Sequence, residues 1–185
     1  MRLVVGLGNP GKEYNNTRHN VGFMFLDYLF LDRFSLNKRF NAMEYDTSIN
    51  GERVIFIKPL SYMNLSGNVV RDYMNFYKIT TDKLLVIQDD LDMDVGRKKL
   101  LFNHNDGGHN GIKNIIANLG SREFLRLKIG ISNAGLMDTK DYVLGKFSSM
   151  EMAKINSVFE ELYSFMDDYM TINRDLLIGK YNKKN

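Results

Sequence analysis

The fold is decided by the stretch RLVVGLGNPGKEYNNTRHNVGFMFLDYLFLDRF, residues 2–34. It begins with a short apolar run closed by glycine, residues 2–6, which is typical of a buried strand that runs into a tight turn. A polar loop follows. From Asn20, which we interpret as a helix N-cap, apolar residues recur at helical spacing to about residue 34. A strand, a glycine-containing loop and a helix in this order predict an α/β fold.

The rest of the chain continues this alternation. The pair Asn50-Gly51 suits a type I′ turn and predicts a hairpin between strands at residues 44–49 and 53–58. Other elements follow from apolar spacing: helices at residues 65–77, 110–119 and 151–169, strands at residues 84–88, 96–102 and 124–132, and a frayed basic tail at residues 180–185. We find no repeat and no linker, so we expect one domain over residues 1–185.

Composition excludes several classes of protein. The chain has 185 residues, of which 44% are apolar and 25% charged, so disorder over its whole length is excluded. It contains no cysteine, which excludes disulfides, thiolate metal sites and a cysteine nucleophile. No apolar run approaches the roughly 18 residues of a membrane span, and residues 1–10 do not resemble a leader peptide, so we expect a soluble cytoplasmic protein. A net charge of +3 permits a polyanionic partner without indicating one.

The glycines that follow the first strand match a dinucleotide-binding pattern in letters only. Gly6, Gly8 and Gly11 have the spacing G-x-G-x-x-G. In that pattern the helix starts within the glycines and points its N-terminus at a pyrophosphate, whereas here Pro10 precedes Gly11 and a polar stretch delays the helix. Nucleotide binding is therefore a competing interpretation that we do not favour, and we expect calorimetry to detect none.

The residue types needed for hydrolysis without a metal lie next to the predicted strands and turns. His19 offers a general base with an intrinsic pKa of about 6.5, and Asp89 offers a carboxylate that can orient it. Asn9, Asn64 and Asn110 lie in loops and can pair with a peptide without charge, although each alone is more typical of a simple turn residue. Neither a G-x-S-x-G serine nor an H-E-x-x-H zinc motif occurs, which favours activated water as the nucleophile.

Four blocks of sequence together resemble one family, the bacterial-type peptidyl-tRNA hydrolases. They are GLGNPGKEYNNTRHNVG at residues 6–22, KPLSYMNLSGNVV at 58–70, DDLDMDVG at 89–96, and GGHNGIKNII at 107–116 with FLRLKIGI at 124–131. The resemblance covers about residues 1–147. It implies a single domain with a twisted mixed sheet flanked by helices on both faces, a three-layer α/β/α arrangement. It also implies cleavage of the ester between a peptide and the terminal ribose of tRNA, which recycles tRNA in translation, with no cofactor and no metal, by a monomer.

Residue roles are implied by the same resemblance at the matching positions. His19 would be the general base and Asp89 would orient it. Asn9 would separate N-blocked from free aminoacyl substrates, while Asn64 and Asn110 would bind the peptide and its carbonyl group. An inactive RNA-binding protein on the same scaffold remains the competing interpretation.

Further matching residues would surround this centre. Tyr14 and Tyr62 would line the cleft around the aminoacyl ester and the terminal adenosine, where an aromatic face can stack. His109 would support the site from a loop that closes over the cleft, and Asn20 is a neighbour of the base with a supporting role.

The chain departs from the family pattern at two places. Residues 103–106, Asn-His-Asn-Asp, stand where many relatives have a glycine-rich stretch, so the loop and the entry to the cleft are expected to differ. Of two basic residues that clamp the 5′-phosphate of tRNA, one is Lys128, but the other falls near Leu101. Lys98 or Lys99 is the candidate substitute.

Overall fold

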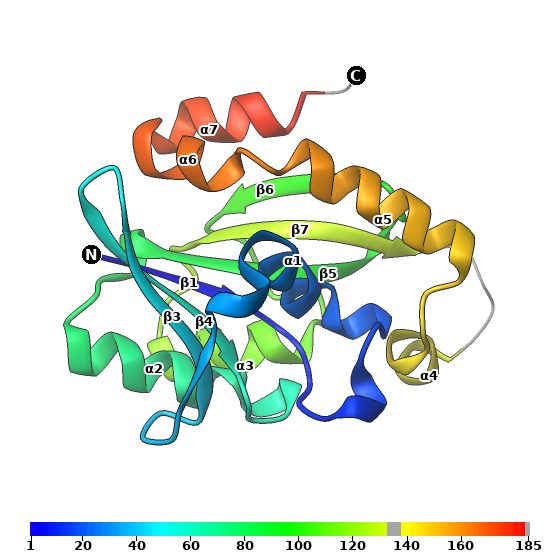
Figure 1. The fold of residues 1–185 in the computed structure, drawn as a ribbon, viewed down its shortest axis with the longest axis horizontal. Helices are drawn as coiled ribbons and strands as arrows, with labels where there is room; N and C mark the ends of the chain where they lie inside the picture. Colours follow the sequence, from blue (N-terminus) through cyan, green and yellow to red (C-terminus); the bar gives the residue numbers. More distant parts are fainter. Residues whose placement is uncertain (133–137, 184–185) are drawn as a thin grey trace.

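The computed structural model describes residues 1–132 and 138–183 (Figure 1). Its centre is a seven-stranded sheet in the order β2-β3-β4-β1-β5-β7-β6. The strands are β1 (Arg2–Gly6), β2 (Ser35–Asn37), β3 (Ala42–Ile49), β4 (Glu52–Pro59), β5 (Leu84–Asp94), β6 (Lys98–Phe102) and β7 (Leu125–Ser132). β1 pairs in parallel with β4 and β5, and β5 with β7, whereas the hairpins β3-β4 and β6-β7 are antiparallel. The sheet is therefore mixed, as the resemblance implied.

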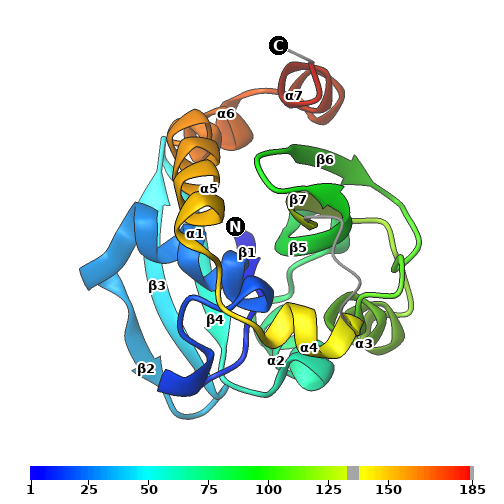
Figure 2. The same cartoon turned by 90° about the vertical axis from the view of Figure 1, so that its right-hand side faces the viewer.

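Helices cover both faces of this sheet. The helices are α1 (Val21–Phe30), α2 (Ser66–Tyr77), α3 (Asn110–Leu119), α4 (Thr139–Leu144), α5 (Ser149–Glu161), α6 (Phe165–Thr171) and α7 (Arg174–Tyr181). Alternate residues of β1 face opposite sides: Val4 packs in the core formed with α1, α5, α6 and α7, while Leu3 and Val5 pack in the core formed with α2 and α3. The expected three-layer α/β/α arrangement is confirmed, and Figure 2 shows the layers from one end of the sheet, with α4 toward the viewer.

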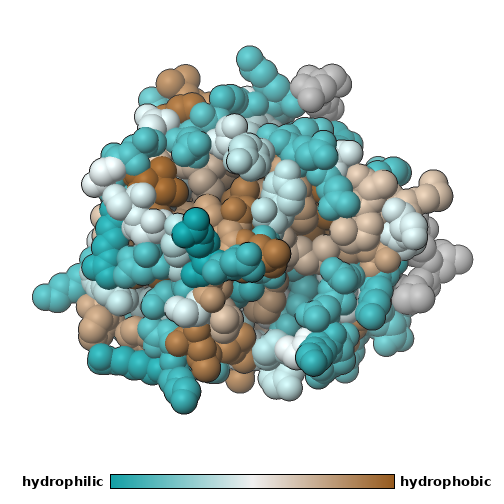
Figure 3. Space-filling model, in the orientation of Figure 1, coloured by the Kyte–Doolittle hydropathy of each residue, from teal (hydrophilic) through white to brown (hydrophobic). Residues whose placement is uncertain are grey.

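The surface is that of an ordinary globular protein. On the face drawn in Figure 3, hydrophilic residues are interspersed with smaller hydrophobic patches. Among the described residues, no helix is long and apolar enough to cross a membrane.

Local signals predicted the central elements well. The hairpin turn forms at Asn50 and Gly51, both with positive φ, 52° and 81°, as a type I′ turn requires. Helices α2 and α3 lie within one residue of their predicted starts and end where predicted. β5 extends to Asp94, beyond its predicted end at residue 88, so Asp89 lies within the strand.

Other boundaries were wrong. The helix predicted to start at Asn20 and run to about residue 34 ends at Phe30 and is followed by a 3-10 turn. Asn20 makes no side-chain cap for it, because its amide is engaged by another loop residue. The helix predicted over residues 151–169 is two helices, α5 and α6, because the chain turns at the fully buried Leu162. β2 and α4 were not predicted at all.

The tail predicted to fray from residue 180 is folded as far as the structure describes it. Helix α7 runs to Tyr181, whose ring packs on Phe165 at 4.9 Å and whose hydroxyl donates to Asp168. The side-chain amide of Asn182 then pairs with β6 at Leu100, accepting from its N–H at 2.8 Å and donating to its carbonyl at 2.9 Å. These tertiary contacts override the polar composition; residues 184 and 185 lie outside the described residues.

Candidate active site

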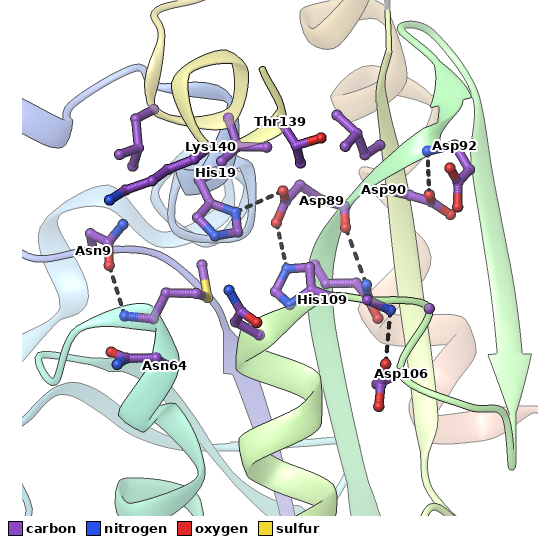
Figure 4. Close-up of a pocket in the computed structure, with 18 of the residues that line it drawn as sticks. Asn9, His19, Asn64, Asp89, Asp90, Asp92, Asp106, His109, Thr139 and Lys140 are labelled. Carbon is purple, nitrogen blue, oxygen red and sulfur yellow. Dashed lines mark hydrogen bonds and ion pairs between the residues drawn. The ribbon is translucent and has the colours of Figure 1, made fainter. Parts of the chain in front are cut away.

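The candidate residues gather at one end of the sheet around a cavity of about 670 Å³ (Figure 4). The loop after β1, the turn before α2, the outer part of β5, the start of α3 and helix α4 all contribute to it. Eight of the ten residues singled out in the sequence line the cavity: Asn9, His19, Tyr62, Asn64, Asp89, His109, Asn110 and Lys128. Tyr14 and Asn20 do not line it, and each instead contacts a residue that does.

Two histidines share one buried carboxylate at the centre of the cavity. Nδ1 of His19 lies 2.8 Å from Oδ2 of Asp89, and Nε2 of His109 lies 2.7 Å from Oδ1. Asp89 is only 3% exposed, so each of its oxygens is held by an imidazole in place of water. The other ring nitrogen of His19, Nε2, has no protein partner within the described part of the chain. His19 is therefore oriented through one nitrogen and free to exchange a proton at the other.

Local structure explains why these three side chains meet. Asp89 lies on β5, where it pairs in register with β7, and His19 lies in the short 3-10 turn that leads into α1. His109 is the N-cap of α3: its Nδ1 accepts from the backbone N–H of Ile112 at 3.3 Å. Because Nδ1 is an acceptor, Nε2 carries the proton of the neutral ring and donates to Asp89. A helix cap thus fixes the tautomer of the second histidine.

The two histidines change the proton affinity of Asp89, and Asp89 changes that of His19. Burial disfavours the charged form of Asp89, but the attraction and hydrogen bonds of His19 and His109 outweigh it and hold the pKa of Asp89 well below its usual value. Burial likewise disfavours the charged form of His19, and the attraction of Asp89 outweighs it, so the pKa of His19 is raised. Asp89 therefore stays ionised, and His19 is a stronger base than a free histidine.

Asn9 is held in a single orientation. Its side-chain oxygen accepts from the backbone N–H of Met63 at 2.7 Å. Its backbone is clamped by Asn20, which accepts from the Asn9 N–H at 2.8 Å and donates to the Asn9 carbonyl at 2.9 Å. Both asparagines are buried. Since Oδ1 is occupied, the amide presents its Nδ2 donor, which has no partner among the described residues.

The other two asparagines are unconstrained. Asn64 and Asn110 are both exposed, one in the turn before α2 and one at the start of α3. No described residue bonds to either side-chain amide. Tyr62 stands beside them, 55% exposed, with its ring edge-on to that of Tyr14 at 6.3 Å. Tyr62 can therefore contact a ligand directly, while Tyr14 supports it from outside the cavity.

The structure shows where the lysines considered for the phosphate contact lie. Lys128 lies 2.5 Å from Asp90 and lines the cavity. Lys99 is its direct neighbour across the antiparallel pair of β6 and β7, so both side chains leave the same face of the sheet. Lys98 leaves the opposite face and pairs with Glu161 at 2.7 Å. Of the two candidate substitutes for Leu101, Lys99 shares a sheet face with Lys128 and Lys98 does not.

The loop that departs from the family pattern is tied down by two arginines. Arg126 donates from one nitrogen to the carbonyl of Asn105 at 2.8 Å and to that of His104 at 3.3 Å. Arg122 donates to the side chains of Asn103 and Asn105. The side chains of Asn103 and Asn105 thus give this loop hydrogen-bond partners. That the loop differs from those of relatives stays a prediction.

The glycines of the first loop serve packing. A Cβ atom on Gly6 would lie 2.6 Å from the carbonyl oxygen of Gly22, and one on Gly8 would lie 2.6 Å from the ring of Phe23. Both glycines therefore let α1 approach the loop closely. The backbone N–H of Phe23, in the first turn of α1, donates to the carbonyl of Leu7 at 3.2 Å, so it bonds to the loop itself and not to a pyrophosphate as in a dinucleotide site.

A metal ion is geometrically conceivable at the centre. The ligand atoms of His19, Asp89 and His109 lie within 4.8 Å of one another. Nδ1 of His19 and Nε2 of His109 already form hydrogen bonds with Asp89, so the three groups are linked as a proton-transfer site without an ion. Hydrolysis without a metal remains a prediction.

Comparison with known proteins agrees with this geometry. A sequence model of the family "Peptidyl-tRNA hydrolase" matches residues 3–185. Peptidyl-tRNA hydrolases of Clostridium novyi and Bacillus cytotoxicus are 45% and 44% identical, over 98% and 92% of this chain and 98% and 93% of theirs. A crystal structure of peptidyl-tRNA hydrolase from Acinetobacter baumannii has a TM-score of 0.92 at 31% identity, over 100% of this chain and 96% of that one.

The chain belongs to the peptidyl-tRNA hydrolase family. The resemblance seen in four blocks over about residues 1–147 thus extends through the C-terminal helices to residue 185. The likeness to a solved member of the family also confirms the three-layer α/β/α fold.

Within this family fold, one wall of the cavity was not predicted from the sequence. Helix α4 contributes Thr139, Lys140, Val143 and Leu144, but six residues are too few to reveal a helical period. Arg18 anchors this helix: its guanidinium donates to the carbonyl of Tyr142 at 3.1 Å, lies 4.1 Å from the Tyr142 ring centre and pairs with Glu151 at 2.9 Å. Arg18 thus links the 3-10 turn that carries His19 to helix α4.

Proposed function

We propose that this chain hydrolyses the ester that joins a peptide to the terminal ribose of tRNA, as an enzyme that recycles tRNA in translation. The observation that carries the proposal is the shared carboxylate: Asp89 holds His19 at 2.8 Å and His109 at 2.7 Å in a cavity lined by uncharged amides. An inactive scaffold would have no need to keep an ionised aspartate buried against two histidines.

His19 is the proposed general base. Nε2 takes a proton from water as the water oxygen bonds to the ester carbonyl carbon. The imidazolium that forms is stabilised by Asp89, and the negative charge on the former carbonyl oxygen is met by amide donors from Asn64 or Asn110. When the carbon–ribose oxygen bond breaks, the proton passes from Nε2 to the ribose oxygen. The products are tRNA with a free ribose hydroxyl and a peptide carboxylate.

Asn9 is the proposed discriminator of N-blocked substrates. Met63 holds the amide oxygen, so the amide cannot flip and offers only a donor to the substrate. The carbonyl of an acylated amino group can accept from Nδ2, whereas a free ammonium group brings a second donor and a positive charge. This arrangement favours peptidyl or N-acyl-aminoacyl esters over aminoacyl esters.

Lys99 and Lys128 are the proposed contact for the 5′-phosphate of the tRNA. They project side by side from β6 and β7, next to the cavity. Since Lys128 is paired with Asp90, phosphate has to compete with this carboxylate, and Lys is the weaker bidentate ligand compared with Arg. We expect a moderate contribution to binding that weakens with salt. Tyr62, supported by Tyr14, would stack on the terminal adenosine.

The remaining expectations belong to the same proposal. The chain would act as a single domain over residues 1–185, as a monomer in the cytoplasm, without metal or cofactor. Its partner would be the acceptor end and peptide of peptidyl-tRNA.

One assay tests the activity. The protein is incubated with N-acetyl-aminoacyl-tRNA and with unblocked aminoacyl-tRNA, each with and without a chelator, and release of the acyl group is followed. We expect cleavage of the blocked substrate only, unaffected by chelator. Lack of cleavage of both would refute the function, equal cleavage would refute the role of Asn9, and loss of activity with chelator would refute metal independence.

A further inference from the structure

Lys140 is an unpaired cation in the wall of the catalytic cavity. It lies in the first turn of α4 and lines the cavity together with His19 and Asn9. In Figure 4 its side chain reaches from α4 past His19 toward the side on which Asn9 lies. No described residue forms an ion pair or a hydrogen bond with its ammonium group, and the side chain is exposed. By contrast, Lys128, the other lysine that lines the cavity, is paired with Asp90.

The carboxylates of the cavity do not neutralise Lys140. Asp90, Asp92 and Asp106 lie on the far side of His109 from Lys140 in Figure 4. Asp89 is taken by the two histidines. Asp141, the next residue, does not line the cavity, and Asp138 caps α4 by accepting from the backbone N–H of Lys140 at 3.0 Å. Apart from the helix cap Asp138, the described acids that line the cavity therefore lie on the side away from Lys140.

The same two sides of the cavity would contact different parts of the substrate, the tRNA phosphates and the peptide. Lys99 and Lys128, the proposed contacts of the tRNA 5′-phosphate, lie on β6 and β7 on the acidic side. Asn9, the proposed contact of the acylated amino group, lies on the side of Lys140. The peptide therefore approaches Lys140, and the phosphates approach the other side.

We propose that Lys140 is a specificity-determining residue that binds an acidic side chain of the peptide next to the scissile ester. The proposal rests on the proposed function. An ammonium group without a protein partner in a concave site gains most from a carboxylate brought by the ligand, because the pair is partly shielded from water there. The enzyme would then cleave esters of aspartate and glutamate faster than those of their amides.

The test uses one tRNA body acylated with N-acetyl-aspartate or with N-acetyl-asparagine, which differ by charge and not by shape. Wild-type protein, Lys140→Met and Lys140→Glu are compared by kcat/KM at low salt. We expect wild type to prefer the aspartate ester by about fivefold, Lys140→Met to lose that preference, and Lys140→Glu to reverse it. Activity on the asparagine ester should stay within about twofold in Lys140→Met.

Controls separate this inference from the function itself. Lys154→Met removes an exposed lysine of α5 that does not line the cavity, and it should leave the preference unchanged. An equal loss on both esters in Lys140→Met would overturn the proposal by assigning Lys140 to a phosphate of the tRNA. An unchanged preference in both Lys140 variants would overturn it too. Failure of wild type to cleave either ester would refute the proposed function.

Discussion

The two walls of the catalytic cavity are held in opposite ways. The histidine wall consists of His19, Asp89 and His109, and every member is fixed by hydrogen bonds of 2.7 or 2.8 Å around a buried carboxylate. The α4 wall, residues 139–144, is anchored from behind by Arg18, while Lys140 on its cavity side has no described partner. Side chains that transfer protons thus have to be held in a fixed orientation. A side chain that binds peptides of different sequence stays available to them when it has no partner within the protein.

The largest effect should come from removing the base of the histidine wall. His19→Ala eliminates the only described group that combines a free imidazole nitrogen with an oriented ring. We expect kcat to fall about a thousandfold or more, with tRNA binding retained. Single-turnover cleavage and a filter-binding assay measure the two quantities. His104→Ala, in an exposed loop outside the cavity, is the matched control. An active His19→Ala variant would show that the histidine wall does not supply the general base.

Removing the shared carboxylate should have the next largest effect and change the pH profile. Because Asp89 raises the pKa of His19, the wild-type base is protonated, and inactive, up to a pH above the usual value of about 6.5. In Asp89→Asn the attraction is lost and burial alone lowers this pKa. We expect kcat/KM to fall about a hundredfold or more and the midpoint of its acid limb to move to lower pH. An unchanged midpoint would show that Asp89 does not act on His19.

His109 should matter less, because it contacts the carboxylate and not the free nitrogen of the base. His109→Ala removes one of two hydrogen bonds to Asp89 and the cap of α3. We expect kcat to fall about tenfold, the value of one hydrogen bond to a charged group, with KM nearly unchanged. His109→Asn, which restores a cap donor and acceptor, should recover the stability but not all of the activity. A thousandfold loss would instead make His109 a direct participant.

The smallest change in rate should come from replacing Asn20, which holds the backbone of Asn9. Asn20→Ala leaves the buried backbone N–H and carbonyl of Asn9 unpaired, which lowers the free energy of unfolding by about 1–3 kcal/mol. The ratio of cleavage of blocked to unblocked aminoacyl-tRNA should fall, while cleavage of the blocked ester changes little. Chemical denaturation and paired assays measure both. Asn15→Ala, an exposed asparagine of the same loop, should change neither, and a preserved ratio in Asn20→Ala would exclude the clamp.

Much of the histidine wall was accessible from the sequence. His19, Asp89 and the three loop asparagines could be named because they lie in recognisable motifs, and their meeting follows from the parallel pairing of β1 and β5. The bond between His109 and Asp89 could not be foreseen, since it depends on the rotamer of a helix cap. Asn20 was misassigned for a related reason: a cap and a side-chain clamp have the same residue preferences and differ only in tertiary partner.

The α4 wall was not accessible. Its helix has six residues, and its position depends on an arginine 121 to 126 residues away in sequence. The C-terminal helices were misjudged for the same physical reason, because buried side chains such as Leu162 and Tyr181 stop or extend a helix against local preference. Apolar periodicity in the sequence thus identifies long helices and strands that face one core. It fails where a few contacts with residues distant in sequence determine the position or the ends of an element.

The pairing of Asn182 with Leu100 has a consequence for biosynthesis. β6 is the last strand of its sheet, and a bare outer strand invites pairing with other chains. The amide of Asn182 occupies one N–H and one carbonyl of that strand. In a nascent chain, the N–H and carbonyl of Leu100 on the edge strand β6 therefore stay unpaired until Asn182 has left the ribosome. Premature termination just before that point would yield a product that self-associates through β6.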